Sequence, residues 1–167
     1  SNFVSIMRQI YQKVFTTALA TGIGCLLIKK IMTMLIRSNT LFAIFELDII
    51  KNKGFFMGLW GDNPMLIKTV MGFCFILFCF MLYKTAMAYP KVSTIYILAP
   101  WMMFAGLTGN MTEMLLNGSV TDYIAIRQPW VETFYFNIED CLIQIGAILF
   151  TYQSIFHNST IEKIYRG

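Results

Sequence analysis

Charge is scarce in this chain of 167 residues: 13% of them are Asp, Glu, Lys or Arg, whereas 57% are hydrophobic. Soluble domains carry about 25% charged residues, so the composition excludes an ordinary soluble domain and predicts an integral membrane protein. The net charge of +4 comes from scattered basic residues, and without a basic patch we expect no nucleic-acid partner. The length predicts one domain over residues 1–167.

Several catalytic and metal-binding patterns are also lacking. His157 is the only histidine, and the chain contains neither Gly-x-Ser-x-Gly nor a glycine-rich phosphate loop of known spacing. We therefore expect no metal and no cofactor. Four cysteines lie in apolar runs at spacings that fit no zinc site, and we interpret them as small buried residues: Cys25, Cys74, Cys79 and Cys141.

Long apolar runs are what the chain has in abundance. A helix needs about 20 mostly apolar residues to cross a bilayer, and four runs meet that length, at about 14–36, 65–87, 92–116 and 137–156. Pro100 interrupts the third run, which neighbouring helices can accommodate within a membrane. The sequence therefore predicts an all-α membrane protein with four transmembrane helices.

Two polar stretches connect these runs. Residues 37–63 are too polar to span the membrane, and they fit short strands or an amphipathic segment on its surface. We expect a small extracytoplasmic β or amphipathic segment there, between the first two helices. Residues 117–136 are expected to form a second loop on the same side.

Charged residues predict the orientation. By the positive-inside rule, both termini are expected to be cytoplasmic, because one side holds more basic residues: Arg8, Lys13, Lys84, Lys91, Lys163 and Arg166. The opposite side holds fewer, with Arg37 at its boundary: Lys51, Lys53 and Arg127. All acidic residues except Glu162 fall on or next to this outer side. Any acid chemistry is therefore expected at the outer face.

Two carboxylates are candidates for that chemistry. Asp122 follows the third run and Asp140 begins the fourth, so an antiparallel pair of helices would bring them together. Two nearby carboxylates do not both ionise readily, and they share one proton. The ionised member can then activate water while the protonated member donates to a carbonyl oxygen, which is the chemistry of metal-free amide hydrolysis.

Structural roles remain open for the same residues. Asn137 fits a helix N-cap, with Glu139 and Asp140 in a first turn where the helix dipole favours anions. Asp122 fits an ordinary loop acid equally well. Two polar residues near the end of the third run fit interhelical hydrogen bonding: Asn110 and Glu113.

Four short stretches resemble motifs of the lipoprotein signal peptidase, or signal peptidase II, family of bacterial inner-membrane aspartic peptidases. In chain order, residues 52–57 resemble its Asn-x-Gly-x-Ala-Phe, 106–114 its Gly-x-x-Gly-Asn-x-x-Asp-Arg, 118–123 its Gly-x-Val-x-Asp-Phe, and 136–140 its Phe-Asn-x-Ala-Asp. The likeness covers about residues 20 to 156.

The resemblance implies that Asp122 and Asp140 are the catalytic dyad of an endopeptidase. Its substrate would be a prolipoprotein carrying diacylglycerol on a cysteine, cut just before that cysteine, with membrane lipid as the other partner. The oligomeric state stays open. Seven further positions would bind substrate or support the site: Asn52, Gly54, Asn110, Glu113, Asn137, Lys29 and Glu139.

The chain departs from the family pattern at four places, one of which is Phe56 in place of an alanine. The family's Asp-x-x-x-Lys appears with Cys25 before Lys29, and Glu113-Met114 replaces Asp-Arg, which loses a possible ion pair. Glu139 replaces an alanine and adds a third carboxylate, which would raise the pKa of the dyad. These departures keep one alternative open, namely a non-catalytic relative that binds lipoprotein signal segments or serves in a membrane complex. A small transporter or lipid-binding membrane protein is a third hypothesis.

Overall fold

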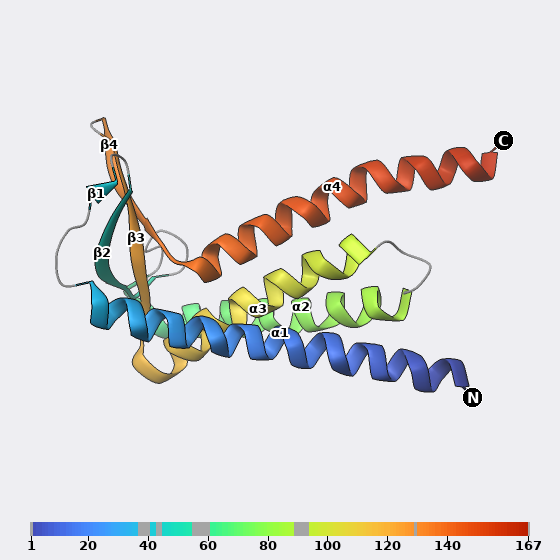
Figure 1. Cartoon of the computed structure of the whole chain (residues 1–167), viewed down its shortest axis with the longest axis horizontal. Helices are drawn as coiled ribbons and strands as arrows, with labels where there is room; N and C mark the ends of the chain where they lie inside the picture. The colour runs from blue at the N-terminus through green and yellow to red at the C-terminus, as the bar shows by residue number, and fades with distance from the viewer. Residues whose placement is uncertain are drawn as a thin grey trace.

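Four long helices make up most of the part of the chain that the structure describes. The computed structural model describes residues 2–36, 41–42, 45–54, 61–88, 94–128 and 130–166. The helices are α1 (Asn2–Leu35), α2 (Pro64–Ala88), α3 (Thr94–Asn117) and α4 (Ile138–Arg166). They run along the long axis of the molecule, with the start of α1 and the end of α4 at one end and a small sheet at the other (Figure 1).

The helices cover most of each predicted apolar run, and two of the helices are longer than the runs. α1 begins at Asn2 rather than near residue 14, and α4 continues to Arg166 rather than ending near residue 156. Within α1 and α2, Tyr11–Leu35 and Pro64–Lys84 are long and apolar enough to cross a membrane. A mostly helical molecule is therefore confirmed, while the count of four spans remains a prediction.

α3 is the central helix of the bundle, because it packs against α1, α2 and α4. Its buried side chains include Phe104, Leu107 and Pro100, and the proline lies inside the helix. Glycines allow the neighbouring backbones to come close: a Cβ on Gly146 of α4 would lie 2.7 Å from the backbone oxygen of Ala99. The middle of α4 is thereby held tightly against α3.

The sheet is antiparallel, in the order β1-β2-β3-β4. β1 (Leu41–Phe42) and β2 (Phe45–Asn52) come from the stretch between the first two helices, where strands were expected. Other residues of that stretch lie outside the described residues: 37–40, 43–44 and 55–60. The alternative prediction for the stretch, an amphipathic segment on the membrane surface, concerns these residues.

The second connection is a correction to the sequence-based prediction. Residues 117–136 were expected to form a loop, but they form β3 (Val120–Gln128) and β4 (Val131–Phe136). Gly118 makes the turn from α3 into β3: its φ is +69° and its N–H donates to the Met114 carbonyl, which ends the helix with a left-handed cap. The sheet thus draws on both connections.

Strand register places polar residues together at the ends of the helices. Asn52 pairs with Val120 and Ile50 with Asp122, and the register shifts at a β-bulge between Leu47 and Ile50. On the other side of β3, Ile124 pairs with Phe136. Asn137 and the start of α4 therefore come directly beside the strand that carries Asp122.

Candidate active site

Asp122 and Asp140 line one cavity of about 330 Å³ where the sheet meets the helices. Asp122 comes from β3 and Asp140 from the first turn of α4. The predicted residues Asn52, Gly54 and Asn110 line the same cavity. The rest of its wall is mostly apolar, with one amide: Met71, Leu107, Val120, Phe134, Tyr135, Ile143, Gln144 and Ala147.

Asn137 caps α4 and aims Asp140. The Asp140 backbone N–H donates to Asn137 Oδ1 at 2.9 Å, and the Asn137 backbone N–H donates to Asp140 Oδ2 at 3.1 Å. This reciprocal pair satisfies two amide groups that a helix start leaves without partners. The cap that the sequence predicted is present, and it fixes the carboxylate of Asp140 in the first turn.

Two amides orient Asp122. Asn137 Nδ2 donates to Asp122 Oδ1 at 2.6 Å, and Asn52 Nδ2 donates to Asp122 Oδ2 at 3.2 Å. The Asn52 amide is itself oriented, because the Gly54 N–H donates to its Oδ1 at 2.9 Å. Asn137 is therefore bonded to both carboxylates, which fixes them relative to each other.

Burial and charge make Asp122 a weak acid. It is 2% exposed on a strand rather than in an open loop. Loss of hydration raises the pKa of Asp122 to about 6, and the negative charge of Asp140 adds to the rise. The hydrogen bonds from Asn52 and Asn137 oppose it, as does the charge of Lys29. The protonated form of Asp122 is thus favoured below about pH 6, next to a second carboxyl group.

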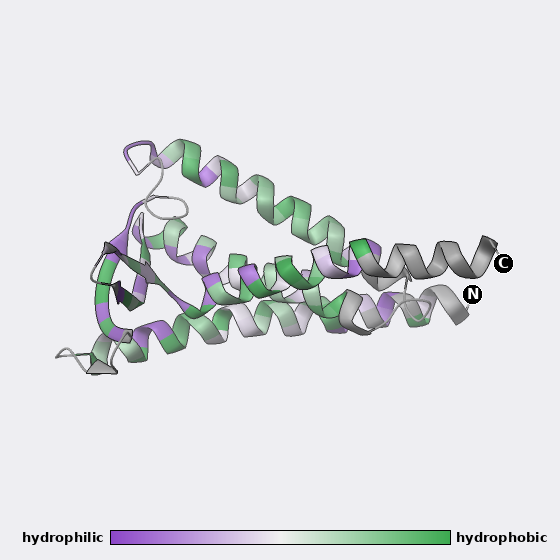
Figure 2. Ribbon diagram, turned by 90° about the horizontal axis from the view of Figure 1, so that it is seen from above, coloured by the Kyte–Doolittle hydropathy of each residue, from purple (hydrophilic) through white to green (hydrophobic). Residues whose placement is uncertain are grey.

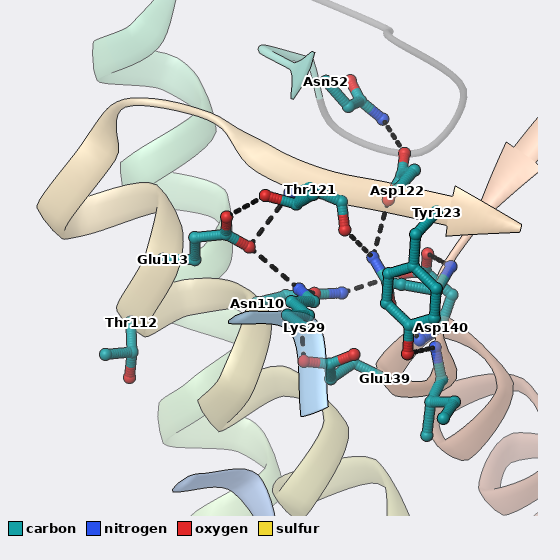
Figure 3. A network of polar contacts seen from close by, with 12 residues as sticks. Lys29, Asn52, Asn110, Thr112, Glu113, Thr121, Asp122, Tyr123, Glu139 and Asp140 are labelled. Atoms are coloured by element: carbon teal, nitrogen blue, oxygen red, sulfur yellow. Dashed lines mark hydrogen bonds and ion pairs between the residues drawn. The ribbon is translucent and has the colours of Figure 1, made fainter. Parts of the chain in front are cut away.

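Lys29 reaches this site from α1 as a buried cation. Its Nζ lies 2.7 Å from Asn110 Oδ1, 3.0 Å from Glu113 Oε2 and 3.2 Å from Glu139 Oε1. Asn110 Nδ2 in turn donates to Asp140 Oδ1 at 2.8 Å. Figure 3 shows this network beside the dyad. The sequence predicted that replacing Asp-Arg by Glu113-Met114 would lose an ion pair. Glu113 nevertheless forms one, with Lys29.

Glu139 faces away from the cavity. It is fully buried, it is not among the residues that line the cavity, and its carboxylate meets Lys29 instead. Although it is the neighbour of Asp140 in sequence, its side chain leaves the first turn in another direction, as Figure 3 shows.

The sequence reasoning missed two polar residues of this network, Thr121 and Lys51. The Thr121 N–H donates to Glu113 Oε2 at 2.9 Å, and its hydroxyl donates to Glu113 Oε1. Lys51 Nζ lies 2.5 Å from Thr121 Oγ1 and 3.4 Å from Glu113 Oε1. In the sequence, Lys51 precedes Asn52 and Thr121 precedes Asp122. This adjacency was the only available signal, because the strand pairing that brings Lys51 and Thr121 together was not predicted.

No group of three or more His, Cys, Asp or Glu that could hold a metal occurs among the described residues. The chemistry that the cavity offers is that of two adjacent carboxyl groups, oriented by amides and enclosed mostly by apolar side chains.

Comparison with known proteins gives one consistent result. A model of the signal peptidase (SPase) II family matches residues 6–156. A lipoprotein signal peptidase of Fusobacterium nucleatum subsp. nucleatum is 30% identical over 116 residues, 70% of this chain and 67% of that protein. Another, from Neisseria meningitidis serogroup C, is 27% identical over 137 residues, 77% of this chain and 78% of that protein.

A solved structure described as a bacterial membrane enzyme has the same fold. It superimposes with a TM-score of 0.72 at 22% identity, covering 89% of this chain and 91% of that one.

Proposed function

The chain belongs to the signal peptidase II family, membrane proteases that cleave the signal peptides of lipoproteins, and we propose that it is an active aspartic endopeptidase with Asp122 and Asp140 as its catalytic dyad. Its substrate would be a prolipoprotein with diacylglycerol on a cysteine, cut just before that cysteine. The observation that carries the proposal is the shared cavity, in which both carboxyl groups are oriented by Asn137.

The surroundings of the two acids favour different roles. Asp140 lies in the first turn of α4, where the helix dipole and the bonds from Asn110 and Asn137 favour its ionised form. Asp122 holds the shared proton, because burial and the charge of Asp140 raise its pKa to about 6. We therefore assign Asp140 as the general base and Asp122 as the general acid.

The reaction then proceeds through one tetrahedral intermediate. Asp140 takes a proton from water, the hydroxyl oxygen bonds to the scissile carbonyl carbon, and Asp122 donates its proton to the carbonyl oxygen. Collapse breaks the C–N bond: Asp140 gives its proton to the leaving amine, and Asp122 recovers a proton from the hydroxyl group. One water is consumed, and the dyad returns to its starting state.

The cavity walls suit a lipid-bearing substrate. Met71, Leu107, Ile143 and Ala147 present apolar surface from three helices next to the dyad. Lipid on the cysteine would hold the scissile bond at the depth of the membrane face. A low local dielectric there strengthens the interaction between the two carboxyl groups.

We further propose that all four helices span the bacterial inner membrane, with both termini cytoplasmic and the dyad at the outer face. The start of α1 and the end of α4 lie at the end of the bundle away from the sheet (Figure 1). Figure 2 supports the same assignment, since hydrophobic residues dominate the helices and hydrophilic ones gather in the sheet.

A fluorogenic lipopeptide assay on the purified protein tests the proposal. Asp122→Asn and Asp140→Asn should each lower kcat at least about a hundredfold, the usual scale of general acid–base catalysis. Asp62→Asn is the matched control, because Asp62 is exposed outside the cavity and should leave the rate unchanged. A wild-type rate no higher than that of the two dyad variants would contradict the peptidase assignment.

A further inference from the structure

Glu139 is a buried acid that the proposed reaction does not use. It is 0% exposed in the first turn of α4, yet it does not line the cavity that contains its neighbour Asp140. Its side chain runs across α3 at Gly109, where a Cβ would come within 2.8 Å of Glu139 Cγ and 3.0 Å of its Oε1. Only glycine leaves this path open.

The path leads to Lys29, which is 3% exposed on α1. A buried ammonium group is costly unless ion pairs and hydrogen bonds surround it. Lys29 has three such partners on two other helices: Glu113 and Asn110 on α3, and Glu139 on α4. Glu139 supplies the contact by which α4 holds the cation.

The position of Lys29 determines which way the Asn110 amide faces. A lysine ammonium only donates hydrogen bonds, so Asn110 must turn its Oδ1 toward Lys29, at 2.7 Å. Its Nδ2 is then directed at Asp140 Oδ1, at 2.8 Å. A reversed amide would present an oxygen to the carboxylate and would disfavour the ionised base.

From these contacts we propose that Glu139 is a positioning residue of the catalytic site: it anchors Lys29 to α4, and Lys29 holds the Asn110 amide with its NH₂ group toward Asp140. Glu139 does not touch the substrate. Its effect passes through two contacts, Glu139 to Lys29 and Lys29 to Asn110, before it reaches the base.

The same ion pair could be formed from α1. Cys25 is buried four residues before Lys29, so the two side chains share one face of the helix. An acid at position 25 would place a carboxylate beside Lys29 without any contribution from α4. Position 25 is a cysteine in this chain and the acid stands at 139, so placing a carboxylate on α1 should restore what a substitution of Glu139 removes.

Steady-state kinetics on a lipopeptide substrate test the role, which rests on the proposed peptidase function. Glu139→Gln keeps the size and removes the charge, and it should lower kcat about tenfold, the loss expected for one charge-assisted contact. KM should stay within about twofold, because Glu139 lies outside the cavity. Glu132→Gln is the matched control on the exposed surface of β4 and should change neither constant.

The decisive variant relocates the charge. Cys25→Asp combined with Glu139→Ala should recover kcat to within about threefold of the wild type, whereas Glu139→Ala alone should be at least tenfold slower. Equal kcat in Glu139→Gln and Glu132→Gln would overturn the proposal. So would a folded double variant no faster than Glu139→Ala. If Glu139→Ala does not fold, an active double variant still supports the role, and a folded but inactive one contradicts it.

A second readout does not depend on catalysis. In protein labelled with ¹⁵N-asparagine, the side-chain NH₂ resonances of Asn110 should shift in Glu139→Gln and return toward their wild-type positions in the double variant. Unchanged resonances would contradict the link from Glu139 to Asn110 even in a protein that lacks peptidase activity. Failure of this inference is thereby separated from failure of the proposed function.

Discussion

Asn137 does two things at once, and they can be separated by substitution. Its Oδ1 caps α4 at the Asp140 N–H, while its Nδ2 donates to Asp122 at 2.6 Å. Asn137→Ser keeps a good N-cap and loses the donor to Asp122, so it should lower kcat about tenfold with little change in Tm. Asn137→Ala loses both and should also destabilise the protein by about 1 kcal/mol.

Kinetics together with thermal unfolding in detergent check this pair of variants. If the serine variant loses as much stability as the alanine variant, the cap is not what stabilises the start of α4. If it keeps full activity, the bond to Asp122 is not needed for the reaction.

Asp122 should weaken the fold at neutral pH. Its pKa is about 6 in the folded protein and ordinarily about 3.8, so the folded state binds the proton more tightly. Stability from the neutral form is present at low pH and is lost as pH rises from about 4 through 6. Asp122→Asn removes this loss, worth up to about 3 kcal/mol. In this variant the hydrogen bond that Asn52 donates to residue 122 is weaker, because the carboxylate is gone, and this offsets about 1 kcal/mol of the gain in stability.

The expected result is a higher Tm for Asp122→Asn at pH 8 and little difference at pH 4, measured against the exposed-site variant Asp62→Asn. A gain of the same size at both pH values would show that ionisation of Asp122 is not its cause.

At the level of single residues, the sequence was informative where the signal is local. The Asn137 cap could be predicted because Asn and the acids of the first turn are consecutive. The direction of the Glu139 side chain could not be predicted, because it depends on Gly109, which leaves a path to α1. Lys51 and Thr121 also escaped prediction, since only the register of β2 and β3 brings them to Glu113.

At the level of elements, Gly106 lies at a close contact between α3 and α4. A Cβ there would overlap the backbone oxygen of Glu139 and come within 2.9 Å of Ile143 Cγ1. Gly106→Ala should push the first turn of α4, and with it Asp140, away from α3. We expect a loss of about 1–3 kcal/mol in stability, as for other overpacked sites, and a marked fall in kcat.

Gly72→Ala in α2 is the control, because among the described residues no atom beyond its own stretch of helix lies within 4 Å of a Cβ built at that position. The same substitution there should be neutral or slightly stabilising, as alanine favours a helix. Both Tm and kcat distinguish the two sites, and equal behaviour of Gly106→Ala and Gly72→Ala would contradict the close contact between α3 and α4.

Helices were easier to predict than strands. Long apolar runs are read from composition alone, and α2 and α3 lie within about two residues of their expected bounds. The hairpin of β3 and β4 was missed because β3 lies between β2 and β4 and buries consecutive residues, such as Thr121, Asp122 and Tyr123. Burial on both faces removes the alternating pattern by which a strand is recognised.

At the level of the whole molecule, polarity follows the long axis. β3, which carries Asp122, and the start of α4, which carries Asp140, lie with the rest of the sheet at one end, while α1 begins and α4 ends at the other (Figure 1). Large apolar side chains are exposed along the helices between these ends, as expected for a surface that faces lipid: Ile23, Leu27, Phe73, Ile76, Phe80 and Ile148.

This arrangement predicts that the two ends of the molecule face different compartments. In a variant without the four native cysteines, Trp130→Cys at the hairpin between β3 and β4 should react with a membrane-impermeant maleimide in intact spheroplasts, since Trp130 is 92% exposed. Ser5→Cys, exposed near the start of α1, should react only after the membrane is permeabilised. Labelling of both positions, or of Ser5→Cys alone, in intact spheroplasts would contradict the proposed orientation and would move the dyad to the cytoplasmic face. There it would meet no exported precursor, so the outcome bears on the proposed substrate as well as on the topology.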